Sequence, residues 1–203
     1  MKLLSGVLAL GVLLTGCSRQ SLLSPSALGG GSNGSLSSSA DSDTTTVHRF
    51  SDASVVPGAT STLLRTGKGV SMTLHTSELE PGAAYTVWWV VFNRPSQCAT
   101  SPCGEPDLFD PDVHAFVTHA AGHVIGPNGT GHFAGSLREG AVSDNLLGGV
   151  GSLENALAAE IHFVVRTHGA PNTPGGVPDQ IHTFEPSCNP SVCQDVQFAI
   201  HQP

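Results

Sequence analysis

The stretch AAYTVWWVVF, residues 83–92, decides the fold of this 203-residue chain. Its residues are mostly β-branched or aromatic, and apolar and polar positions do not alternate, which is typical of a strand buried on both faces. An aromatic pair can also line a carbohydrate or ligand groove. In so apolar a strand, we expect at least one of Trp88 and Trp89, and preferably both, in the core. The stretch predicts a central strand of a β-sheet.

Further strand signals lie on both sides of this stretch. Residues 69–77 alternate apolar and polar positions, the pattern of a half-buried strand, and residues 159–167 and 195–201 are two more strands. The last strand is expected to direct its apolar side chains inward and its polar ones outward: Val196, Phe198 and Ile200 to the core, and Asp195, Gln197 and His201 to solvent.

Residues 111–138 admit two interpretations. A helix that ends at Gly126 would place His119 and His123 one turn apart, which is a metal-ligand spacing. The turn sequence PNGTG at residues 127–131 favours a β-hairpin instead, and we prefer it. Residues 153–160 form either one short helix or a loop. Repeated strands and frequent turns predict an all-β fold, an immunoglobulin-like β-sandwich with at most one short helix.

The N-terminus carries an export signal. Lys2 and the apolar run 3–14 have the charge and length of a signal peptide, which we assign to residues 1–16. Leu14-Thr15-Gly16-Cys17 resembles the lipobox of bacterial lipoproteins. The resemblance implies that the signal peptide is cut off before Cys17 and that Cys17 receives lipid chains such as palmitate. These chains would anchor the protein in the membrane of the bacterial cell envelope. The alternative is a secreted protein with a chance cysteine at this position.

The Gly- and Ser-rich residues 17–46 are expected to form a lipidated flexible tether, which leaves residues 47–203 as the β-sandwich domain. Charged residues make up only 12% of the chain, and the formal net charge is −8. An acidic surface disfavours nucleic acid as a partner, so we expect none. The predicted location is the cell envelope, at the outer membrane or cell surface.

The four remaining cysteines form two C-x4-C loops, Cys98 to Cys103 and Cys188 to Cys193. They could form a zinc site, but zinc-binding cysteines usually stand two to four residues apart. An exported chain also enters an oxidising compartment. We therefore prefer two local disulfides among the three possible connectivities.

The body of the chain is similar to a group of uncharacterised exported bacterial proteins. The segments that carry this resemblance are YTVWWVVFN, the two C-x4-C loops, AEIHFVVRTHG and DVQFAIH, and they span most of residues 68–203. A shorter likeness, confined to the EIH strand, is to chordin-type extracellular domains. Neither resemblance implies an activity.

One strand has a shared polar face. Glu160, His162, Arg166 and His168 alternate with the apolar residues of the strand and are expected to point the same way. With His123 from another strand, His162, His168 and Glu160 are the candidate ligands of a copper or zinc ion. The alternative is a set of structural histidines, with Glu160 paired to Arg166. Asn93 and Arg94 follow the central strand at an end of the sandwich, where binding loops gather.

Two other kinds of site are weighed and set aside. The acidic stretch 105–112 could bind calcium, but it lacks the spacing of an EF-hand loop. No nucleophile motif is present, so we expect no catalytic residue. The leading hypothesis is a membrane-anchored, non-catalytic binding or structural module with an unknown protein or small-molecule ligand and no required cofactor. The alternative is a copper or zinc carrier, or a redox enzyme, that uses the histidines.

Overall fold

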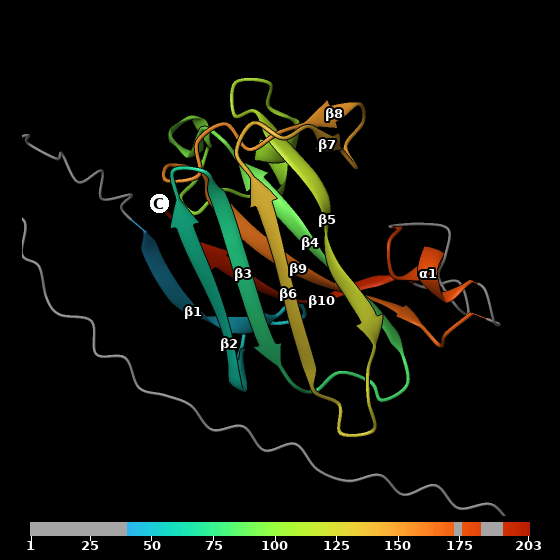
Figure 1. Ribbon diagram of the computed structural model, residues 1–203. Helices are drawn as coiled ribbons and strands as arrows, with labels where there is room; N and C mark the ends of the chain where they lie inside the picture. The colour runs from blue at the N-terminus through green and yellow to red at the C-terminus, as the bar shows by residue number, and fades with distance from the viewer. Residues whose placement is uncertain (1–39, 173–175, 184–192) are drawn as a thin grey trace, which may run out of the picture. The chain divides into compact units, whose positions relative to one another are not determined.

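The computed structural model describes residues 40–172, 176–183 and 193–203 of the chain (Figure 1). The predicted signal peptide, the lipobox with Cys17, most of the predicted tether and Cys188 lie outside these residues. Among the described residues, no helix is long and apolar enough to cross a membrane.

Eight strands form one antiparallel sheet in the order β5-β4-β9-β10-β1-β2-β3-β6. Their bounds are β1 (Asp41–Arg49), β2 (Val55–Thr66), β3 (Gly69–Thr76), β4 (Ala84–Phe92), β5 (Ala115–Val124), β6 (Gly131–Arg138), β9 (Glu160–Gly169) and β10 (Gln194–His201). The smaller elements are β7 (Ser143–Asp144), β8 (Val150–Gly151), the 3-10 helices η1 (Pro95–Gln97) and η2 (Glu105–Phe109), and α1 (Val177–Gln180). The predicted all-β class is confirmed.

Strand β4 is buried along its whole length, as its composition predicts. It pairs with β5 on one side and β9 on the other. Trp89 and the other odd-numbered residues face the main core inside the curved sheet, whereas Trp88, Val90 and Phe92 face outward into a second apolar cluster. Both tryptophans are buried, so the preference for core positions is confirmed.

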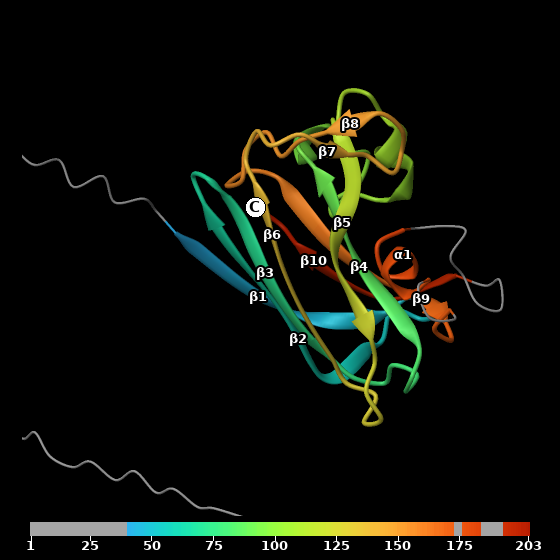
Figure 2. The ribbon, with the colours of Figure 1, turned by 45° about the vertical axis from the view of Figure 1, so that its right-hand side comes forward.

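The sheet curls until its two edge strands, β5 and β6, approach each other (Figure 2). A Cβ atom at Gly135 in β6 would lie 3.0 Å from the carbonyl oxygen of Ala120 in β5. The ring of His123 in β5 stacks on that of Phe133 in β6, with centroids 4.4 Å apart. The result is a single barrel-like sheet, and the immunoglobulin-like sandwich is not confirmed.

Residues 111–138 form strands and not a helix, but the predicted hairpin ladder is wrong. The turn at residues 127–131 does connect β5 to β6, yet β5 is hydrogen-bonded to β4 and β6 to β3. Local turn chemistry indicated that the two strands follow each other directly. It could not indicate that they meet across the closing seam of the sheet.

The predicted facing of β10 is wrong from Gln197 onward. Gln197, Ala199 and His201 are buried, whereas Phe198 lies outside against Phe50. The pairing with β9 shifts between Asp195 and Gln197. Such a bulge inserts one extra residue and reverses the alternation that follows it, so polar side chains enter the interior.

One boundary of the domain differs from expectation. Residues 41–46, which the sequence places in the tether, belong to β1 and pair with β2 from Asp41↔Arg65 onward. Residues 153–159 form a loop with turns before β9, which is the second of the two predicted alternatives, and the short helix is α1. Strand β1 was missed because its outward residues are Ser and Thr, which resemble the linker before them.

Candidate binding groove on the outer face of the sheet

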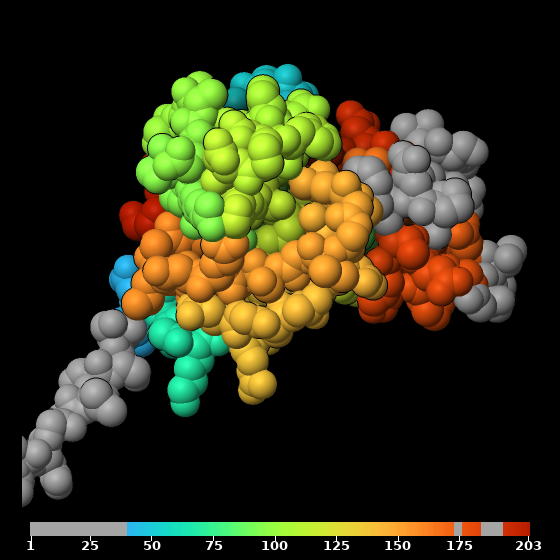
Figure 3. All heavy atoms as spheres, turned by 90° about the horizontal axis from the view of Figure 1, so that it is seen from above, coloured from blue at the N-terminus to red at the C-terminus, as the bar shows by residue number. Residues whose placement is uncertain are grey.

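The outer face of β4, β5 and β9 carries a compact apolar surface. Trp88, Val90 and Phe92 alternate outward on β4, and Val117 and Val164 flank them on the neighbouring strands. Two loop regions, residues 93–114 and 139–159, gather at one end of the domain (Figure 3). Leu108 from the first loop and Leu147 from the second pack on the apolar surface. The loops therefore enclose part of the surface and leave part of it accessible.

The first loop is fastened by a disulfide and a buried carboxylate. Cys98 and Cys103 are disulfide-bonded with Cα atoms 5.4 Å apart, which confirms the predicted local pairing. Asp107 accepts hydrogen bonds from the backbone N–H groups of Ala99 at 2.8 Å and Gly104 at 2.6 Å. These two bonds lower the pKa of Asp107. Asp107 belongs to the acidic stretch considered as a calcium site, and its carboxylate instead holds the backbone of the loop in place.

A cavity of about 390 Å³ opens between the loops and the sheet. The outward residues of β4, together with Val117, Val164 and the leucines of the loops, form most of its lining. A second cavity of about 470 Å³ adjoins it and shares Trp88, Val117 and Leu146 with it. We call the two together the Trp88 groove. Each is within the size range of small-molecule sites, which are mostly apolar with a few placed polar groups.

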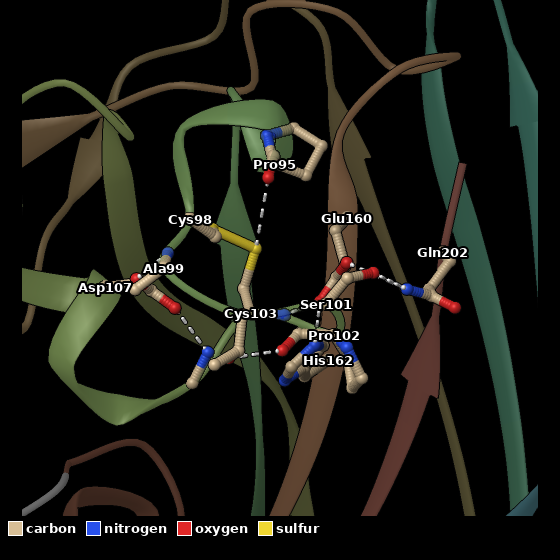
Figure 4. Close-up of a disulfide and its surroundings, with 12 residues drawn as sticks. Pro95, Cys98, Ala99, Ser101, Pro102, Cys103, Asp107, Glu160, His162 and Gln202 are labelled. Atoms are coloured by element: carbon tan, nitrogen blue, oxygen red, sulfur yellow. Dashed lines mark hydrogen bonds and ion pairs between the residues drawn. A yellow bond between two sulfur atoms is a disulfide. The ribbon is translucent and has the colours of Figure 1, made fainter.

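His162 lines the groove, and Glu160 lies behind it, buried beside the disulfide (Figure 4). His162 Nε2 lies 2.7 Å from Glu160 Oε1, and the same oxygen accepts a 2.7 Å hydrogen bond from the backbone N–H of Cys103. Burial raises the pKa of Glu160, but the bonds from His162 and Cys103 outweigh it and the net pKa is lowered. An ionised Glu160 thus holds the disulfide loop to β9 and orients the imidazole.

The second cavity is the more polar part of the groove. His119 from β5 and His182, just after α1, stack with ring centroids 4.6 Å apart. His119 Nε2 donates a 3.0 Å hydrogen bond to the carbonyl oxygen of Ile181. Burial lowers the pKa of His119 and outweighs the bond to Ile181, which raises it. A neutral imidazole therefore faces the groove beside Trp88.

The charged residues that line the groove are acidic. Glu105, Asp144 and Asp195 lie on its rim, and no Lys or Arg is among its described lining residues. Asp195 accepts a 2.7 Å hydrogen bond from Arg166, which corrects the expected pairing of Arg166 with Glu160. The charge of Asp195 is offset by Arg166, and Coulomb repulsion from Glu105 and Asp144 disfavours an anionic ligand at this rim. The geometry suits a neutral or cationic molecule with an apolar or aromatic body.

The four residues predicted as copper or zinc ligands are brought together only in part. Glu160 and His162 are bonded to each other. His168 is fully buried between Thr86, at 2.7 Å, and the disulfide-bonded Cys193, at 3.4 Å. A register shift in β5 places His119 outside and His123 inside, against Phe133. These imidazoles do not converge on one point.

Asn93 and Arg94, predicted as possible loop-site residues, hold the second loop. Asn93 donates to the carbonyl oxygens of His114 and Ser152, each at 2.9 Å, and accepts a 2.8 Å bond from the backbone N–H of Glu154. Arg94 forms an exposed ion pair with Glu154. Both residues therefore shape the covering loops.

One arrangement in the interior was missed from the sequence. His201 Nδ1 lies 2.6 Å from Asp43 Oδ2, and its Nε2 lies 2.8 Å from Ser61 Oγ. The order of contacts is that of a Ser-His-Asp triad. Ser61 and His201 are fully buried, so a substrate cannot reach the hydroxyl. The three residues instead join β1, β2 and β10 inside the sheet.

A single metal-capable group of three or more residues is found in the described part of the chain: Cys98, Cys103 and Asp107. Its two sulfur atoms form the disulfide, so neither is a thiolate that could bind an ion. Comparison with protein-family models, with curated proteins and with solved structures found no match to this chain.

Proposed function

We propose that this chain is a lipid-anchored envelope protein whose β domain binds a neutral or cationic, largely apolar ligand in the Trp88 groove. The observation that carries the proposal is the cavity of about 390 Å³ on the outer face of β4, bounded by apolar side chains from three strands and two loops. Apolar clefts of this size with a few polar groups are where small ligands usually bind.

The rest of the arrangement supports a binding role over a catalytic one. His162 lines the groove and is held in place by Glu160, so its imidazole could form a hydrogen bond that orients a ligand. In the arrangement of Asp43, His201 and Ser61, the hydroxyl and the imidazole are fully buried. The anchor at Cys17 would keep the domain at the membrane, and the acidic surface disfavours nucleic acid as a partner.

The proposal is tested with the neutral fluorescent probe N-phenyl-1-naphthylamine, whose emission rises in apolar surroundings. Leu146 lines both cavities and is 39% exposed, so Leu146→Asp changes the groove at small cost to folding. We expect saturable binding that Leu146→Asp weakens by about 10-fold or more, because a carboxylate would be desolvated against the probe.

Leu64→Asp is the matched control, since Leu64 is also 39% exposed and lies on β2, outside the groove. Its binding curve should superimpose on that of the unaltered chain. Equal weakening by both substitutions, or emission that never saturates, would rule out the groove as the binding site.

A further inference from the structure

Two exposed histidines face each other on the outer surface of β3 and β6, strands that do not line the Trp88 groove. His75 and His132 are direct register partners in this antiparallel pair. Both strands alternate buried and exposed residues, and both histidines occupy exposed positions. Partners of this kind have Cβ atoms about 5 Å apart and project to the same side. The strands therefore hold the two imidazoles together.

The two rings meet through equivalent nitrogens. His75 Nδ1 and His132 Nδ1 are 2.5 Å apart, with ring centroids 4.7 Å apart and planes inclined by 71°. One ring must donate and the other accept, so only one proton lies between the two nitrogens. Within the described residues, neither ring has a carboxylate partner in an ion pair. The two Nδ1 atoms thus face one point at the surface, and each offers an in-plane lone pair there once the shared proton is lost.

We propose that His75 and His132 form a binding site for a transition-metal dication, with Cu²⁺ held most tightly and Zn²⁺ less so. Imidazole suits both ions, and Cu²⁺ ranks above Zn²⁺ for a given set of nitrogen ligands. The ion replaces the shared proton and is bound by both Nδ1 atoms. Because both side chains are exposed, the remaining coordination positions are open to water or to a ligand from solution.

Little rearrangement is needed. With metal–nitrogen bonds of about 2.0–2.1 Å, two ligand nitrogens at square or tetrahedral angles lie about 2.9–3.4 Å apart. The two Nδ1 atoms therefore have to separate by about 0.4–0.9 Å. Side-chain rotation of two exposed residues can supply this movement while the β3–β6 ladder stays intact.

The other close histidine pair lacks this geometry. His119 and His182 stack with an interplanar angle of 25°, so their in-plane lone pairs run nearly parallel and do not converge. One nitrogen of each ring is also hydrogen-bonded to a backbone carbonyl oxygen: His119 to that of Ile181, and His182 to that of Pro178. His123 on β5 packs on Phe133 and has its pKa lowered by burial and then by His132.

The test is a Cu²⁺ titration of the full chain at pH 7.5, without an affinity tag and with any free thiol blocked by iodoacetamide. Electron paramagnetic resonance reports the nitrogen ligands, and calorimetry reports the affinity. We expect one Cu²⁺ with two imidazole nitrogens. His75→Gln and His132→Gln should each weaken it at least about 10-fold, since loss of even a supporting residue costs that much. The double variant should be little weaker than either single one, because both nitrogens serve one ion.

His114→Gln is the control, because His114 is an exposed histidine paired with Glu154 away from β3 and β6. Its affinity should equal that of the unaltered chain, and thermal melts should show that all variants fold. Because Zn²⁺ should also bind to His75 and His132, it should raise the melting temperature of the unaltered chain but not that of the His75→Gln variant. No saturable Cu²⁺ binding, or affinity within about 3-fold in the His75 and His132 variants, would overturn the site.

Discussion

At the scale of single residues, four histidines of the chain are buried or partly buried and have a lowered pKa. Burial is the largest cause of the lowered pKa of His119, His123, His168 and His201. The lowering is greatest at His168, whose pKa falls from 6.5 to about 4. Hydrogen bonds replace the lost water: Thr86 bonds His168, and Ser61 and Asp43 bond His201.

Because these histidines have lowered pKa values, we predict that the folded domain loses stability as the pH falls below neutral. Between pH 6.5 and about 4 the unfolded chain protonates His168 while the folded chain does not, so lowering the pH favours unfolding. The contribution of His168 is up to about 3 kcal/mol. Urea unfolding at pH 7.5 and 5.0 should show a smaller fall in stability for His168→Gln than for the unaltered chain. Equal falls in the two proteins would contradict the assignment.

Breaking the hydrogen bond between His162 and Glu160 should lower the free energy of unfolding by a measurable amount. The Glu160 side chain is 2% exposed and that of His162 is 13% exposed, so His162→Leu withdraws a donor from a buried carboxylate. We expect a loss of about 1–3 kcal/mol in the free energy of unfolding. His114→Leu removes the same type of contact where both side chains are about 40% exposed, and should cost less than about 1 kcal/mol. Similar losses in both variants would show that burial does not decide the strength of the pair.

At the scale of elements, the sequence predicted those strands in which each face is consistently apolar or consistently polar. Strand β4 is apolar on both faces, and β3 alternates cleanly, so both were predicted to within a residue or two. Strand β2 was missed because its interior positions include Ser61 and Arg65. The buried Arg65 is accommodated by the carbonyl oxygens of Ala156, Ala159 and His201, groups contributed by distant segments.

The candidate sites were predicted less well than the strands, because they depend on register. The shared polar face of β9 was predicted correctly, with Ile161, Phe163 and Val165 in the core. Its partners were not, since bulges in β5 and β10 change which side chains meet. The opposition of His75 and His132 likewise follows from the β3–β6 pairing, which links residues 57 positions apart. No local pattern encodes that contact.

The closing seam of the sheet gives a prediction about strand packing. At Gly135 a Cβ atom would lie 3.0 Å from the Ala120 carbonyl oxygen and 3.5 Å from the Trp89 ring, so Gly135→Val overpacks the seam. We expect a loss of about 1–3 kcal/mol in urea unfolding. Ala134→Val, at the exposed neighbouring position on β6, should stay within about 0.5 kcal/mol of the unaltered chain. Equal stability of the Gly135→Val and Ala134→Val variants would mean that β5 and β6 are not in close contact.

At the scale of the whole molecule, the proposal joins a membrane anchor to a ligand-binding domain. The anchor rests on the lipobox at Leu14-Thr15-Gly16-Cys17, which lies outside the described residues. We predict that Cys17→Ser abolishes incorporation of labelled palmitate and leaves an unprocessed or released chain. Labelling that persists in this variant would refute the anchor but leave the groove untouched.

The most direct test of the Trp88 groove uses the two tryptophans themselves. The chain contains two, at neighbouring positions, and β4 directs Trp88 to the groove and Trp89 to the interior. Their two indole N–H signals in a ¹⁵N nuclear magnetic resonance spectrum can be assigned with Trp88→Phe and followed while N-phenyl-1-naphthylamine is added. A saturable shift of the Trp88 signal, with that of Trp89 nearly unchanged, is the predicted result. A titration that moves neither signal, or moves Trp89 alone, would contradict ligand binding in the groove.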